Sequence, residues 1–94
     1  MKISAIDQDL LTLLQGKELY GLEIVEKINF NRPVQLTYGS VYPALKRLLQ
    51  KKLVRDRWGD DSSVGARRKY YRLTALGVRK LKEVQRYRKQ LQSL

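Results

Sequence analysis

Apolar residues recur at helical spacing in the first 30 residues of the chain. The first set comprises Ile3, Ile6, Leu10, Leu13 and Leu14, and the second comprises Leu19, Leu22, Ile24, Val25 and Ile28. Steps of three or four positions are typical of one face of an amphipathic helix. The pattern therefore predicts a helix over about residues 4–15 that ends near Gly16, and another over about residues 20–29 that ends before Pro33.

A third apolar stripe, in the segment LTYGSVYPALKRLLQKKL, predicts a helix from residue 38 or 40 to about residue 51. Side chains expected on its opposite side, or at the border of that side, are Ser40, Tyr42, Pro43, Lys46, Arg47 and Gln50. Two N-caps are compatible with the sequence. Ser40 would place Pro43 in the first turn, where the proline costs no backbone hydrogen bond, whereas Thr37 would cost one.

Two runs of strand-favouring residues, LVRDRW and RKYYRL, flank the turn-forming segment GDDSSVGA, and this predicts a β-hairpin with an exposed tip. Alternation sends Arg67, Lys69 and Tyr71 to one face and Arg68, Tyr70 and Arg72 to the other, with Tyr71 expected in the core. Thr74 is then the candidate N-cap of a last helix.

This order of elements predicts a mainly α fold with a small β-hairpin (α+β): a winged helix-turn-helix over residues 1–73 and a long C-terminal helix over residues 74–94, in one compact unit. A helix of about 19 residues is about 28 Å long, more than a core of this size can cover. Its distal half should therefore pack on a partner subunit, together with the first helix. The residues expected at this homodimer interface are Ile3, Ile6, Leu10, Val84, Tyr87, Leu91 and Leu94.

Positive charge is concentrated in the C-terminal two thirds of the chain. The whole chain carries 20 Lys and Arg against 9 Asp and Glu, a net charge of +11. Residues 1–36 have a net charge of −1 and residues 37–94 of +12. A polyanion is the expected partner of the second part. A membrane surface is not, because the apolar stripe of the last helix is weak.

Cysteine and histidine are absent from the sequence. Disulfides, thiolate nucleophiles, imidazole catalysis and His/Cys metal sites are therefore excluded. With no nucleophile–base pair in view, we expect no enzyme, no catalytic residue, no metal site and no cofactor. The N-terminus does not have the pattern of a signal peptide, and no apolar run approaches about 18 residues, which predicts a cytoplasmic protein.

A major groove of B-DNA admits one α-helix, and helix-turn-helix proteins insert the second helix of the pair. The candidate DNA-binding residues on that helix are Tyr38, Ser40, Tyr42, Lys46 and Arg47, and those on the wing are Arg67, Arg68, Lys69 and Tyr70. Arg47 has the chemistry for a bidentate contact with guanine. Tyr42 suits either packing or DNA contact. A stacking platform for single strands would need a broader sheet than two strands.

Three segments resemble the PadR family of bacterial transcriptional regulators over residues 8–80, namely LLTLLQGKELYGLEI, LTYGSVYPALKRLLQKKLV and GARRKYYRLTALG. The resemblance implies a homodimeric repressor that binds inverted-repeat operators, with a recognition helix from Thr37 to about Lys51. The chain is similar in length to short forms of the family that lack a larger effector domain, such as a Pex-like branch in cyanobacteria. The resemblance therefore does not assign to this chain the effector that some members sense. The chain departs from the family pattern at Tyr20, Leu22 and Ala75.

The alternative function is a protein-binding adaptor that uses the winged helix as an interaction surface without specific DNA binding. An adaptor has no need for the charge of residues 37–94. The charge therefore favours a sequence-specific regulator that binds double-stranded DNA.

Overall fold

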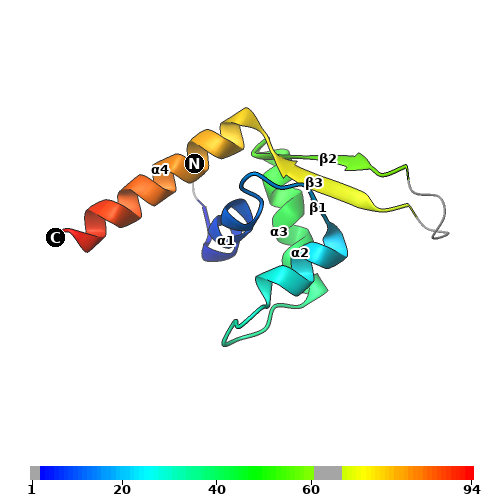
Figure 1. The fold of residues 1–94 in the computed structure, drawn as a ribbon, viewed down its shortest axis with the longest axis horizontal. Helices are drawn as coiled ribbons and strands as arrows, with labels where there is room; N and C mark the ends of the chain where they lie inside the picture. The colour runs from blue at the N-terminus through cyan, green and yellow to red at the C-terminus, as the bar shows by residue number, and fades with distance from the viewer. Residues whose placement is uncertain (1–2, 61–66) are drawn as a thin grey trace.

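The computed structural model describes residues 3–60 and 67–94, so the expected hairpin tip lies largely outside the described residues. The elements are α1 (Ala5–Leu13), β1 (Leu19–Tyr20), α2 (Gly21–Ile28), α3 (Tyr38–Gln50), β2 (Val54–Trp58), β3 (Lys69–Leu73) and α4 (Ala75–Gln92). As Figure 1 shows, α1, α2 and α3 gather on one side of a small sheet and α4 extends away from them. This arrangement confirms the predicted α+β winged helix-turn-helix with a long C-terminal helix.

The sheet has three strands where the sequence predicted two. Its order is β1-β3-β2, and both pairs are antiparallel. Leu19 of β1 pairs with Tyr71 of β3, and Val54 of β2 pairs with Leu73. The prediction missed β1 because a strand of two residues is too short to show alternation, and its residues had been assigned to the start of the following helix.

The helix starts follow from local capping. The Ser4 hydroxyl accepts a hydrogen bond from the Asp7 amide at 3.1 Å, and the Thr74 hydroxyl accepts one from the Gly77 amide at 3.0 Å. Thr74 is thus confirmed as an N-cap. The N-cap of α3 is Thr37, with extended backbone angles and no side-chain cap bond, so the alternative start at Ser40 is wrong. Pro43 consequently lies inside the helix and removes one backbone donor.

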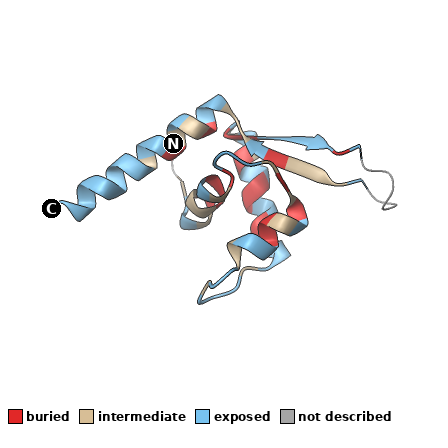
Figure 2. Cartoon of the chain, in the orientation of Figure 1, coloured by how far each residue is buried: buried red, intermediate tan, exposed pale blue. Residues whose placement is uncertain are grey.

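The core lies where α1, α2 and α3 meet the sheet, shown in red in Figure 2. Its largest side chains that are under 2% exposed include Leu10, Leu11, Leu14, Ile24, Leu45, Leu48, Leu53 and Leu81. Tyr71 is 6% exposed, which confirms its predicted place in the core. Among the described residues, no helix is long and apolar enough to cross a membrane.

The start of α4 is fixed to the turn between α3 and β2. The Thr74 hydroxyl donates to the Lys52 carbonyl at 2.6 Å, and the Thr74 amide donates to the Leu53 carbonyl at 3.1 Å. A Cβ at Gly77 would lie 1.9 Å from the Leu53 carbonyl oxygen, so only glycine fits this contact. Beyond Leu81 the helix outruns the core, as predicted: Tyr87 is 60% exposed, and α4 is the long arm in Figure 1.

Candidate nucleic-acid interface

One side of α3 is exposed along its whole length. The helix buries Val41, Ala44, Leu45 and Leu48. Its exposed strip consists of Gly39, Pro43, Lys46 and Gln50. Of the predicted contact residues, Lys46 lies in this strip and Ser40 is half-buried beside it, 3.4 Å from the Thr37 hydroxyl. The strip is of the kind that a recognition helix offers to a major groove.

Tyr38 and Tyr42 form a stacked pair on the edge of α3 that faces the wing. Their ring centroids are 5.7 Å apart with an interplanar angle of 14°, and both residues remain more than 40% exposed. Tyr42 also packs over Gly21 of α2, where a Cβ would lie 2.5 Å from the tyrosine oxygen. Burial, followed by the proximity of Tyr38, raises the pKa of Tyr42, which keeps its hydroxyl a hydrogen-bond donor. Tyr42 therefore combines the two roles that the sequence left open for it: packing, and exposure toward a ligand.

Arg47 is exposed, as the helical wheel predicted, but its guanidinium also reaches α1. Its Nη2 lies 3.1 Å from Oδ1 of Asp7 on α1, and the Lys51 Nζ lies 4.0 Å from Oδ2 of the same carboxylate. The Asp7 side chain is 2% exposed, whereas the Arg47 side chain is 45% exposed. A buried carboxylate requires a paired cation, and this requirement turns Arg47 toward α1. The wheel could not reveal this because Asp7 lies 40 positions away.

The wing carries its cations on two faces, as the predicted alternation requires. On the face shared with Tyr71, the Lys69 Nζ lies 3.3 Å from Asp56 Oδ2 and 4.8 Å from the centroid of the Trp58 ring. The Arg67 guanidinium lies 5.7 Å from the same ring. Trp58 is 52% exposed and pairs with Lys69 across the strands. Trp58 was not among the predicted binding residues, although the sequence places it at the end of a strand next to a turn.

The opposite face of the sheet is built from tyrosines and arginines. The Tyr20 and Tyr70 rings meet edge to face with centroids 5.7 Å apart. Arg57 lies 4.8 Å from the centroid of Tyr70, and Arg68 lies 4.5 Å from that of Tyr20. Despite its third strand, this face is no open platform for stacking bases, because guanidinium groups already cover both rings.

Arg57 is further held by Glu18, with a shortest N–O distance of 2.5 Å. The hydrogen bond from Arg57 lowers the pKa of the Glu18 carboxyl, against a smaller opposing effect of desolvation. Glu18 directly precedes β1, so this ion pair connects β2 to the segment that leads into β1.

A surface hollow joins the recognition helix to the wing. Its lining residues are Tyr20, Gly21, Leu22, Tyr42, Arg67, Arg68, Lys69 and Tyr71. Four of the nine predicted DNA-binding residues thus meet in one place, although Tyr42 comes from α3 and the other three come from the first residue of β3 and the two residues before it. The other five predicted residues do not line the hollow.

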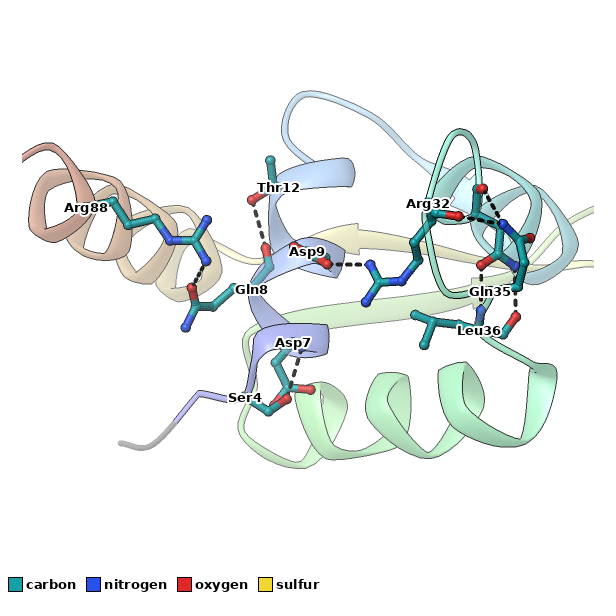
Figure 3. Close-up of polar contacts among 10 residues, drawn as sticks. Ser4, Asp7, Gln8, Asp9, Thr12, Arg32, Gln35, Leu36 and Arg88 are labelled. Atoms are coloured by element: carbon teal, nitrogen blue, oxygen red, sulfur yellow. Dashed lines mark hydrogen bonds and ion pairs between the residues drawn. The ribbon is translucent and has the colours of Figure 1, made fainter. Parts of the chain in front are cut away.

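The residues predicted for the dimer interface fall into four groups. Leu10 is 0% exposed inside the single chain, because it lies on the face of α1 that packs into the core, so its assignment to an interface is wrong. Ile3 and Ile6 are partly buried against the core. Val84, Tyr87 and Leu91 line a surface hollow beside Gln8 of α1, where Arg88 donates a hydrogen bond to the Gln8 side-chain oxygen (Figure 3). Leu94 is 99% exposed.

Solved structures and a curated relative resemble this chain. A PadR-family transcription regulator of Clostridium difficile R20291 superimposes with a TM-score of 0.87 at 31% identity, covering 96% of this chain and 93% of that one. Bacillus subtilis PadR, solved in complex with operator DNA, superimposes with a TM-score of 0.74 at 24% identity, covering 85% of this chain and 46% of that one, which is a likeness of fold. An uncharacterized protein of Lysinibacillus sphaericus is 36% identical over 81 residues, which are 84% of this chain and 73% of that protein.

The family model that describes PadR-like transcriptional regulators matches residues 10–83, which contain α2, α3, the sheet and the first half of α4. The recognition-helix strip, the wing and the arm-like last helix thus all lie wholly or partly inside the matched segment. The chain belongs to the PadR-like family of transcriptional regulators.

Proposed function

We propose that this chain is a sequence-specific regulator that binds double-stranded DNA, with α3 in the major groove and the wing on the flanking phosphates. The observation that carries the proposal is the hollow in which Tyr42 of α3 meets Arg67, Arg68 and Lys69 of the wing. In this hollow, a helix that fits the major groove and a cluster of cations form one continuous surface, as duplex recognition requires. The operator complex of the Bacillus subtilis relative supports the same use of the fold.

Each part of this surface has its own role in the proposal. The hydroxyls of Tyr38, Ser40 and Tyr42 bond phosphates or base edges, and Lys46 contacts the groove. Arg67, Arg68 and Lys69 neutralise phosphates, and Tyr70 supports Arg57 on the outer face of the wing. The proposal does not include the predicted guanine contact of Arg47, because the Arg47 guanidinium is held by Asp7.

We also propose that the chain works as a homodimer on an inverted-repeat operator and represses transcription, with no small-molecule effector assigned. The exposed apolar residues of the α4 arm, Tyr87, Leu91 and Leu94, support a partner subunit at the distal end of that helix. The partner subunit would also contact Ile3, Ile6 and Val84. As a DNA-binding regulator, the protein would act in the cytoplasm. We assign no catalytic residue to it. Residues 1–73 would bind DNA and residues 74–94 would join the subunits.

Titration of duplex DNA at several salt concentrations tests the proposal. Each neutralised phosphate adds about −0.9 to the slope of log K against log salt. Three phosphate-binding cations per subunit, Arg67, Arg68 and Lys69, therefore give a dimer a slope of up to about −5. Selection from a random duplex pool should yield an inverted repeat with half-site centres about 34–36 Å apart, or a multiple of that spacing. Absent or salt-independent binding would instead favour the protein-binding adaptor.

A further inference from the structure

Asp7 is an unusual residue in this basic protein. Among the residues that the structure describes, Asp7 is the one charged residue that is buried, with 1% of its surface exposed. Its carboxylate lies between α1 and α3, and its amide donates to the Ser4 hydroxyl (Figure 3). A buried carboxylate that loses its cations becomes strongly destabilising, so Asp7 binds its partners firmly.

Those partners are cations of the recognition helix. Arg47 and Lys51 are one turn apart on the edge of α3 that faces α1, and they approach the two oxygens of Asp7 at 3.1 and 4.0 Å. This edge adjoins the exposed strip that contains Lys46 and Gln50. Without Asp7, the Arg47 guanidinium would therefore lose its carboxylate beside the surface that meets DNA.

The helix that carries Asp7 is itself anchored on two other sides. Asp9 accepts a 2.7 Å ion pair from Arg32 in the α2–α3 linker, and Gln8 accepts a hydrogen bond from Arg88 of α4 (Figure 3). Three consecutive residues thus connect α1 to the recognition helix, to the linker before it and to the last helix. Because α1 is anchored in this way, the ion pair between Asp7 and Arg47 fixes the position of α3 relative to α1.

We propose that Asp7 is a positioning residue for DNA recognition: it holds Arg47 against α1 and keeps its guanidinium out of non-specific phosphate contacts. This inference rests on the proposed DNA-binding function. Non-specific affinity grows with each phosphate that a cation neutralises, independently of sequence. A cation bound to a buried carboxylate adds little to that affinity, so discrimination between sites is left to the strip of α3 and its tyrosines.

The test compares the wild type with Asp7→Asn, which keeps the shape of the side chain and removes its charge. Dissociation constants are measured at several salt concentrations on the duplex selected by the wild type and on an unrelated duplex of equal length. The variant should bind the unrelated duplex more tightly, with a salt slope steeper by about 0.9 per subunit, because the Arg47 guanidinium is released. The ratio of the two dissociation constants should fall toward one.

Two further variants separate positioning from a general change of charge. In Asp7→Asn/Arg47→Gln the released guanidinium is gone, so the added slope should disappear and the ratio should recover. Glu83→Gln makes the same change in net charge and releases Lys80 of α4, which lies outside the proposed DNA-binding surface, so it should leave the slope and the ratio unchanged. Circular dichroism confirms that each variant is folded before binding is measured.

A folded Asp7→Asn protein with the wild-type slope and ratio would overturn the proposal, since Asp7 would then serve stability alone. If Asp7→Asn does not fold, Arg47→Gln decides: the proposal expects a wild-type salt slope, and a slope weaker by about 0.9 per subunit would show that Arg47 contacts a phosphate. Absence of salt-dependent DNA binding by the wild type would instead reject the proposed function itself.

Discussion

The ring of Tyr42 in the recognition helix lies directly over Gly21 at the start of α2. A Cβ built at position 21 would lie 2.5 Å from the tyrosine oxygen and 3.0 Å from Cε1. The two helices of the helix-turn-helix pair thus meet at a glycine and an aromatic ring. The ring is held in this position while it remains 41% exposed to a ligand.

Gly21→Ala should therefore weaken both stability and DNA binding. The added methyl group must displace the Tyr42 ring, and overpacking of this kind costs about 1–3 kcal/mol of the free energy of unfolding. Gly39→Ala is the matched control for stability alone, because its Cβ would meet nothing closer than 3.6 Å and alanine is the better helix former, whereas its place in the exposed strip of α3 makes it unsuitable as a DNA-binding control. Thermal unfolding and duplex titration measure both effects. Equal melting temperatures for the two variants would contradict the contact.

Thr74 holds the start of α4 through one hydroxyl, which caps the Gly77 amide and donates to the Lys52 carbonyl. Thr74→Val keeps the shape and removes both bonds, and it should lower the free energy of unfolding by about 1–2 kcal/mol, the usual cost of a lost cap. Thr74→Ser keeps the hydroxyl and should lose much less. Chemical denaturation of the two variants checks this, and a serine variant as unstable as the valine variant would show that the methyl group matters instead.

Trp58 is the single tryptophan of the chain and lies on the wing beside Lys69 and Arg67. If this face of the wing meets phosphates, both cations move relative to the ring, and the fluorescence of Trp58 should change as duplex DNA is added. The midpoint should shift with salt in parallel with the binding constant. An emission spectrum that stays constant through a complete titration would place the DNA contact elsewhere.

Lys69→Gln should reduce the salt slope by about 0.9 per subunit, because one phosphate contact is lost. Arg72→Gln removes the same charge from the opposite face of the sheet and is the matched control. A larger change for Arg72→Gln than for Lys69→Gln would mean that the other face of the wing is turned toward DNA.

Leu91 is 48% exposed on the distal half of α4, and we propose that a partner subunit covers it. Leu91→Asp would place a charge in that apolar contact and should shift the protein toward monomer in sedimentation. Gln92→Asp introduces the same group one position along the helix and should leave the dimer intact. A dimer that survives Leu91→Asp would indicate that the subunits meet through another surface.

The pattern of apolar positions was sufficient to find all the helices described here and the hairpin, because each of them is long enough to repeat its period. The cap at Thr74 and the inward position of Tyr71 were also predictable, since both depend on near neighbours in the sequence. The strand at Leu19 and Tyr20 was not, because its pairing partner in β3 lies about 50 positions away.

The sequence by itself determined the fold class, the basic second part of the chain and the exposed strip of α3, all of which follow from periodicity and composition. Only the tertiary structure decided which cations are available to a ligand. Arg47 looked free on a helical wheel, yet a carboxylate on another helix holds it, while Lys46 beside it stays exposed. Ion pairs between distant segments depend on packing and burial, and local spacing contains no information on either.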